Sequence, residues 1–205
     1  MLSMYSSLRL SLALVAVILS GQVFAGGDAV QGKILADTCK GCHAVDSYTN
    51  VYPTYHVPRI AGQSADYLAT ALTLYRDGNR EHPTMTAQAA SFSDQDIQDI
   101  VAYLSGAGPE LDPAAAPVGD VPPAAVVCAA CHGMAGVSAI PTNPHLAGQH
   151  LNYLEQSLSQ YRSGTRKGPN AIAMQAQLST VSEEELAAIS AFYAAQDGLT
   201  VLSMD

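Results

Sequence analysis

Two motifs of this sequence could carry chemistry, and both have the spacing Cys-x-x-Cys-His. The motif residues are Cys39, Cys42 and His43 in the first half and Cys128, Cys131 and His132 in the second. At this spacing two thiols can form thioether bonds to the vinyl groups of one haem, while the adjacent histidine binds the haem iron. The sequence therefore predicts two covalently bound haem c groups, one for each motif.

Two other kinds of site use closely spaced cysteines, namely a dithiol redox pair and a zinc site. A thioredoxin-like dithiol is expected between a strand and a helix, but neither motif lies in a strand pattern. A zinc site would combine both cysteine pairs, yet the pairs lie 89 residues apart, one in each half of the chain. All four cysteines lie in the two motifs, so none is left for a structural disulfide. These points favour haem attachment.

Two methionines lie at the same distance from the motif histidines. Met85 follows His43 by 42 residues, and Met174 follows His132 by 42 residues. A methionine that only fills a core need not keep such a spacing, so we expect both to bind the haem iron opposite the histidine. Histidine and methionine together fill both axial positions and raise the reduction potential. An iron closed in this way transfers electrons without binding substrate, so no catalytic residue is expected.

The prolines Pro58 and Pro144 occupy matching positions in the two halves. An iron-bound histidine usually donates its second ring N–H to a backbone carbonyl. We expect the carbonyl groups of these prolines to accept those hydrogen bonds, and simple stiffening of the loop is the alternative. Of the remaining histidines, His82 lies close to Met85 and is the one rival iron ligand. The other three are interpreted as residues on the surface or around the iron ligands: His56, His145 and His150.

The motifs belong to a longer repeat. The recurring segments are 58–63 with 144–149, 67–68 with 153–154, 75–76 with 161–162, and Gly78 with Gly164. The offset is 86 residues for these segments and 89 residues for the haem motifs and the methionines, which a three-residue deletion and a later three-residue insertion explain. A unit of this length is a duplicated domain, since solenoid repeats span about 20–50 residues.

Both copies show helical periodicity. The apolar residues of segment 67–75 fall on one helical face, and Gly78 follows as a C-terminal cap. Ser93 with Asp96, and Ser182 with Glu185, form the pattern of a capping serine with an acid three residues later. Neither copy has a convincing alternating strand. The sequence therefore predicts an all-α fold made of two tandem helical domains.

The expected organisation is a leader over residues 1–25, a first domain over 26–106, a linker over 107–122 and a second domain over 123–205. The linker is rich in Pro, Ala and Gly, which disfavours a continuous helix. A first helix is clear over residues 28–38. In the second copy, Pro122 and Pro123 leave the equivalent helix short or missing.

Residues 1–25 have the pattern of an export signal. Arg9 precedes an apolar run over residues 10–19, and Val23-Phe24-Ala25 supplies a cleavage site. The run is shorter than the roughly 20 apolar residues of a spanning helix, and a retained membrane anchor is the alternative. We expect cleavage after Ala25 and no stable membrane insertion afterwards. The formal net charge of −9 argues against nucleic acid binding and favours a partner with a basic docking patch.

Taken together, these features resemble the cytochrome c4 family. The resemblance rests on two Cys-x-x-Cys-His modules, each followed by Pro-x-[Ile/Leu]-Ala-Gly-Gln, Tyr-Leu, Tyr-Arg-x-Gly and a downstream Met, over residues 26–196. It implies two small cytochrome c domains that face each other across a pseudo-twofold axis, with the haem propionates near the interface. It further implies electron transfer in the periplasm, often to a terminal oxidase. It supports Met85 and Met174 as iron ligands and the carbonyls of Pro58 and Pro144 as partners of the ligand histidines.

The expected function is that of an electron carrier, which docks transiently between a respiratory or substrate-oxidising donor protein and a terminal acceptor such as an oxidase. One alternative is the electron-accepting dihaem subunit of a dehydrogenase, similar to flavocytochrome c sulfide dehydrogenase with its flavoprotein partner. A second alternative is an enzyme in its own right, such as a dihaem peroxidase or a thiosulfate-oxidising cytochrome. The matched methionines and the lack of a spare cysteine argue against it.

Overall fold

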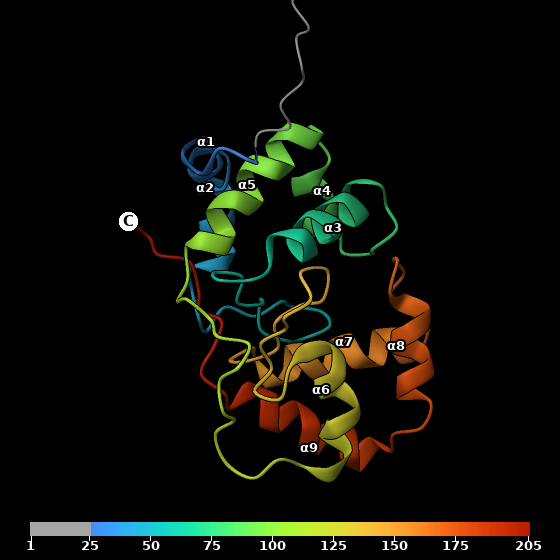
Figure 1. The fold of residues 1–205 in the computed structure, drawn as a ribbon. Helices are drawn as coiled ribbons and strands as arrows, with labels where there is room; N and C mark the ends of the chain where they lie inside the picture. Colours follow the sequence, from blue (N-terminus) through green and yellow to red (C-terminus); the bar gives the residue numbers. More distant parts are fainter. Residues whose placement is uncertain (1–25) are drawn as a thin grey trace, which may run out of the picture.

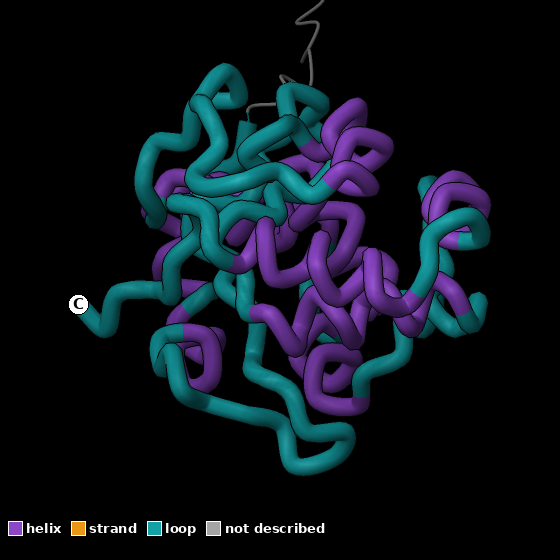
Figure 2. Tube along the Cα trace, turned by 90° about the horizontal axis from the view of Figure 1, so that it is seen from below, coloured by secondary structure: helices purple, strands orange, loops and turns teal. Residues whose placement is uncertain are grey.

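The computed structural model describes residues 26–205, and in this range its regular elements are helices (Figures 1 and 2). The expected leader and its cleavage site lie outside the described residues. The elements are α1 (Ala29–Leu35), α2 (Asp37–His43), α3 (Ala65–Arg76), α4 (Pro83–Ala89), α5 (Asp94–Gly106), the 3₁₀ helix η1 (Pro123–Ala125), α6 (Val126–His132), α7 (Leu151–Arg162), α8 (Ala171–Leu178) and α9 (Glu183–Ala194). Apart from these helices there are two isolated β-bridges within the described range. The all-α prediction is confirmed.

In the first half, α1 lies directly against α5. Asp28 caps α1 by accepting hydrogen bonds from the backbone N–H groups of Val30 and Gln31 at 2.8 and 3.2 Å. Gly32 makes the close crossing of the two helices possible, because a Cβ atom at this position would lie 1.8 Å from the carbonyl oxygen of Asp99 on α5. This pair of helices holds the haem motif, which follows on α2, against the rest of the first half.

The core of the first half lies between α3 and α5. Its buried side chains include Leu68 and Leu72 on α3 and Ile97, Ile100 and Leu104 on α5. The expected caps are present: Gly78 follows α3 with φ of 72°, and the Ser93 side chain accepts from the N–H of Asp96 at 3.1 Å. The apolar face expected from the sequence is therefore the face that α3 buries.

The second half has the same plan, except that its first helix is reduced to η1. Pro122 and Pro123 lack the N–H groups that a longer helix would use, so the chain enters α6 after a single turn. The core is formed by Leu154 on α7 and by Ile189, Phe192 and Tyr193 on α9, with Ala125 of η1 fully buried against them. The expectation of a short first helix in the second copy is confirmed.

The C-terminal tail, residues 199–205, returns from α9 to the first half (Figure 1). Thr200 forms a β-bridge with Ala61, and the Leu202 side chain is 2% exposed within the first hydrophobic core. The N–H of Leu202 donates to the carbonyl of His43 at 2.9 Å, and Lys40 Nζ donates to the backbone oxygen of Asp205 at 3.3 Å. The tail therefore packs directly beside the first haem motif.

The two halves face each other through reciprocal contacts of two glutamines. Gln149 of the second half bonds the backbone N–H and C=O of Arg59, at 2.9 and 2.8 Å. Gln63 of the first half bonds the backbone N–H and C=O of His145, at 2.7 and 3.0 Å. Because the partners occupy matching repeat positions, the interface has the pseudo-twofold arrangement that the family resemblance implies.

Candidate functional site

A single cavity of about 1140 Å³ lies between the two halves. It is lined by all ten residues that the sequence singles out: Cys39, Cys42, His43, Pro58, Met85, Cys128, Cys131, His132, Pro144 and Met174. Its volume exceeds the roughly 300–1,000 Å³ of ordinary ligand pockets, which fits two macrocycles better than one small ligand. The structure therefore brings every predicted site residue to one continuous space.

Each haem motif is carried by a short helix that orients its reactive side chains. On α2, Cys39 and Cys42 are three residues apart and His43 is four residues from Cys39, so all three lie on adjacent turns of one face. The same holds for α6 in the second half. No disulfide joins the four cysteines in the described range, and burial raises the pKa of the Cys39 and Cys128 thiols. Thiols held side by side in this way are suited to form two thioether bonds to one macrocycle.

The two motif histidines are buried and hydrogen-bonded to the prolines. The Nδ1 atom of His43 lies 2.8 Å from the carbonyl oxygen of Pro58, and that of His132 lies 3.0 Å from the carbonyl oxygen of Pro144. A carbonyl can only accept, so Nδ1 carries the hydrogen in both rings. Burial lowers the pKa of both imidazoles, which favours the neutral ring. Each ring therefore has a free Nε2 lone pair, as an iron ligand requires.

The two matched methionines lie on equivalent helices. Met85 is on α4 and Met174 is on α8, and both line the cavity. His82 stands directly before α4, and its Nδ1 atom accepts a hydrogen bond from the N–H of Met85 at 3.3 Å. This rival ligand thus serves in the structure as the N-terminal cap of the helix that carries Met85.

The other three histidines make local contacts. His145 Nδ1 accepts from the N–H of Ser138 at 3.0 Å. His56 and His150, one from each half, stack with their ring centroids 4.7 Å apart. The stack places His56 and His150 at the boundary between the two halves, whereas the His145 ring contacts its own half.

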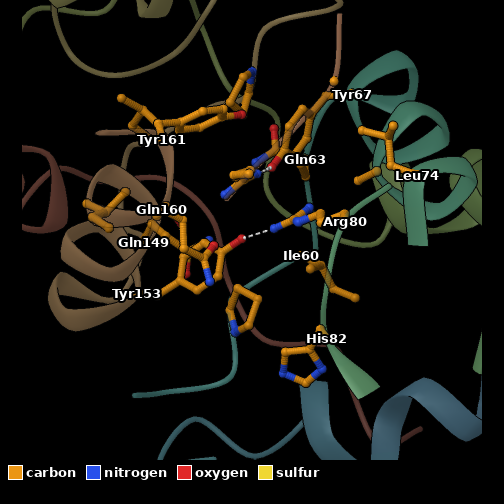
Figure 3. Close-up of a pocket in the computed structure, with 18 of the residues that line it drawn as sticks. Ile60, Gln63, Tyr67, Leu74, Arg80, His82, Gln149, Tyr153, Gln160 and Tyr161 are labelled. Carbon is orange, nitrogen blue, oxygen red and sulfur yellow. Dashed lines mark hydrogen bonds between the residues drawn. The ribbon is translucent and has the colours of Figure 1, made fainter. Parts of the chain in front are cut away.

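The structure also reveals a polar cluster that the sequence analysis missed. Arg80 Nη2 donates to the hydroxyl of Tyr153 at 2.9 Å (Figure 3), and Arg166 Nη2 donates to the hydroxyl of Tyr67 at 2.7 Å. Each bond joins one half of the molecule to the other. The repeat could have pointed to these arginines, because Arg80 and Arg166 also occupy matching positions, 86 residues apart.

The described part of the chain lacks two further features. Between residues 26 and 205, no three His, Cys, Asp or Glu side chains gather as a metal-binding group. Over the same residues, no helix combines the length and the apolar character needed to cross a bilayer.

Two helices with Cys-x-x-Cys-His, each with an oriented histidine and a shared cavity, define a c-type cytochrome. The sequence model of the cytochrome c family matches residues 29–108 and 124–194, one match for each half. The chain carries two covalently bound haem c groups, one in each of its two cytochrome c domains.

Comparisons with individual proteins show to which family of c-type cytochromes the chain belongs. The chain is 32% identical to cytochrome c4 of Pseudomonas aeruginosa over 85% of its length and 91% of that protein. It is 30% identical to a thiosulfate dehydrogenase electron acceptor of Stutzerimonas stutzeri, over 78% of this chain and 79% of that one. The crystal structure of reduced cytochrome c4 from Pseudomonas stutzeri superposes with a TM-score of 0.64 and 26% identity, over 83% of this chain and 99% of that one. The chain belongs to the cytochrome c4 family and is a dihaem electron-transfer cytochrome.

Proposed function

We propose that this cytochrome is a periplasmic carrier, exported with cleavage after Ala25, that passes single electrons from a respiratory or substrate-oxidising donor to a terminal acceptor such as an oxidase. In each domain a histidine and a methionine would hold the iron: His43 with Met85, and His132 with Met174. The haem iron supplies one-electron chemistry, and these side chains keep it from binding substrate.

The protein's own residues would act as follows. His43 and His132 present Nε2 to the iron, because Nδ1 is held by a proline carbonyl at 2.8 and 3.0 Å. Met85 and Met174 would each supply a thioether sulfur as the second protein ligand, from the equivalent helices α4 and α8. Buried apolar side chains of α3, α5, α7 and α9 shield the cavity from water. A low-dielectric surrounding of this kind favours the less charged, reduced state.

The single observation that carries this proposal is the matched pair of methionines on the equivalent helices α4 and α8, in one cavity with the matched histidines. The test combines mass spectrometry of the mature protein with an optically followed redox titration. We expect a mass increase of two haems, two one-electron transitions and the optical band of sulfur–iron ligation. Met85→Ala and Met174→Ala should each remove half of that band. A band unchanged in both variants would disprove methionine ligation.

The cellular part of the proposal has its own test. The expected result is a mature N-terminus at Gly26 in a periplasmic fraction of the native host. A protein that still carries residues 1–25 and sediments with membranes would instead support the retained anchor.

A second candidate is the electron-accepting subunit of a dehydrogenase. It is favoured by the relative that is named as an electron acceptor of thiosulfate dehydrogenase. Purification from the native host separates the two candidates. A stoichiometric dehydrogenase partner that survives gel filtration would support the subunit, whereas a free dihaem protein would support the carrier.

A further inference from the structure

The C-terminal tail, residues 199–205, contacts the first haem motif at two points. The backbone N–H of Leu202 donates to the carbonyl of His43 at 2.9 Å, and Lys40 Nζ donates to the backbone oxygen of Asp205 at 3.3 Å. Both motif residues are buried, with 7% of His43 and 8% of Lys40 exposed. The tail, which runs back from α9 (Figure 1), therefore forms part of the surroundings of the first motif.

The bond from Leu202 closes the end of α2. His43 is the last residue of this helix, and the last four carbonyl groups of a helix have no partner within it. A buried carbonyl that stays unbonded destabilises the fold. The N–H of Leu202 supplies the donor for His43, so the helix that carries the first haem motif is completed by the far end of the chain.

The second haem motif obtains its donors from its own domain. The carbonyl of Cys131, next to the end of α6, accepts from Ser138 Oγ at 2.7 Å and from Asn143 Nδ2 at 3.1 Å. Both donors lie in the loop that follows α6. The second contact point of the tail has no counterpart either, because the position of Lys40 is occupied by Ala129 in the second motif. The two motif helices are therefore held in different ways.

His43 is held both at its ring and at its backbone. The carbonyl of Pro58 accepts from the ring at Nδ1, at 2.8 Å, and the N–H of Leu202 bonds the backbone carbonyl. The ring bond alone sets where Nδ1 points, but the imidazole plane can still turn when the backbone that carries it moves. The two bonds together fix the position and the plane of the ring.

We propose that Leu202 is a positioning residue of the first haem site: its N–H holds the backbone of His43 and so sets the orientation of the imidazole at the iron. The proposal rests on the proposed function in one respect, namely that His43 binds the iron. The first haem should then depend on the tail, whereas the second haem should not. Two haems in duplicated domains thereby become inequivalent.

The test replaces Leu202 by proline in the purified dihaem protein. Leu202→Pro removes the N–H and keeps an apolar side chain. Val201→Pro is the matched control, because within residues 26–205 the N–H of Val201 donates no hydrogen bond. In nuclear magnetic resonance spectra of the oxidised protein, the paramagnetic shifts of the haem methyl groups depend on the plane of the iron-bound imidazole. Leu202→Pro should change these shifts at the first haem and leave those of the second haem, whereas Val201→Pro should leave both.

A redox titration of the same samples gives a second readout. A loosened His43 lets water approach the first iron, and water stabilises the oxidised haem, which has one positive charge more than the reduced haem. At a fixed applied potential, the ratio of reduced to oxidised first haem should fall about threefold in Leu202→Pro, or about 28 mV for one electron. The second haem should keep its wild-type ratio. Met85→Ala, which alters the first haem directly, assigns the resonances and transitions to the two haems.

The proposal is wrong if Leu202→Pro keeps the methyl shifts and potentials of both haems while the wild type shows its two one-electron transitions, a result that leaves the carrier function intact. Equal changes at both haems would also overturn it, because the tail would then act on the whole molecule. If Leu202→Pro does not assemble, Leu202→Ala takes its place. Its shorter side chain holds the tail less firmly, so we expect a smaller change that is still confined to the first haem. A lower unfolding free energy with unchanged methyl shifts would show a purely structural tail and refute the positioning role.

Discussion

The side-chain amide of Gln149 bonds both backbone groups of Arg59, at 2.9 and 2.8 Å. Arg59 directly follows Pro58, whose carbonyl accepts the hydrogen bond that orients His43. The second domain therefore holds the loop that fixes the histidine of the first domain. Gln63 does the same for His145, which follows Pro144.

Replacement of this glutamine should weaken the whole molecule. In Gln149→Leu the N–H and C=O of Arg59 lose their partners inside the interface, which should cost about 2–4 kcal/mol of unfolding free energy. Denaturant unfolding of the dihaem protein, followed by absorbance, measures the change. Gln98→Leu, at an exposed position of α5, is the control and should change the free energy by less than about 0.5 kcal/mol. Equal effects of the two variants would contradict the role assigned to Gln149.

The stacked pair of His56 and His150 predicts a loss of stability in acid. Burial, Arg59 and His56 lower the pKa of His150 from 6.5 to about 4, although Asp46 at 3.5 Å opposes them. The unfolded chain therefore binds a proton at His150 before the folded chain does. Stability is complete above pH 6.5 and falls as the pH drops towards 4, by about 1–3 kcal/mol.

Unfolding midpoints measured between pH 4 and pH 7 test this prediction. His150→Phe keeps an aromatic ring against His56 but cannot be protonated, so its stability should change less over this range than that of the wild type. An equal loss in both proteins would assign the acid sensitivity to other groups.

Two glycines of the first domain, Gly32 and Gly41, should respond in opposite ways to replacement by alanine. Gly32→Ala would place a Cβ atom 1.8 Å from the carbonyl oxygen of Asp99, so α1 must move away from α5, at a cost of about 1–3 kcal/mol or more. Gly41→Ala, within the first haem motif, meets no atom within 4 Å and should stabilise α2 by about 0.5–1 kcal/mol. The matching position of the second motif is already Ala130. Thermal unfolding of both haem-loaded variants gives the comparison, and similar shifts would contradict it.

The tail residue Leu202 should be required by the first domain. Leu202→Ala removes a side chain that is 2% exposed and should cost about 2–4 kcal/mol. Met204→Ala, at a position that is 68% exposed, should cost less than about 0.5 kcal/mol. Hydrogen exchange shows where the change occurs: the amides of α3 and α5 should lose protection more than those of α7 and α9. A loss confined to the second domain would refute the placement of the tail.

The sequence predicts most of what lies inside one domain. The helix caps at Ser93 and Ser182 and the buried face of α3 follow from local chemistry, and the structure has them. The ten site residues follow from motif chemistry and from the register of the two copies. The structure places all ten around one cavity, while iron binding by two histidines and two methionines among them stays a prediction.

Contacts between the domains could not be predicted in the same way. A repeat shows what each copy contains, but it does not show which surfaces of the copies meet. The bonds of Arg80 to Tyr153 and of Arg166 to Tyr67 depend on that geometry. The packing of Leu202 in the first core could not be predicted for a different reason. Residues 199–205 have no matching segment after the first domain with which they could be compared.

The position of Leu202 also bears on how far the first domain depends on the second. Leu202 lies almost 100 residues after the end of the first cytochrome domain, yet its side chain is part of the core of that domain. A protein cut between the two domains would therefore lack Leu202 in its first core, so loss of the second domain should also destabilise the first.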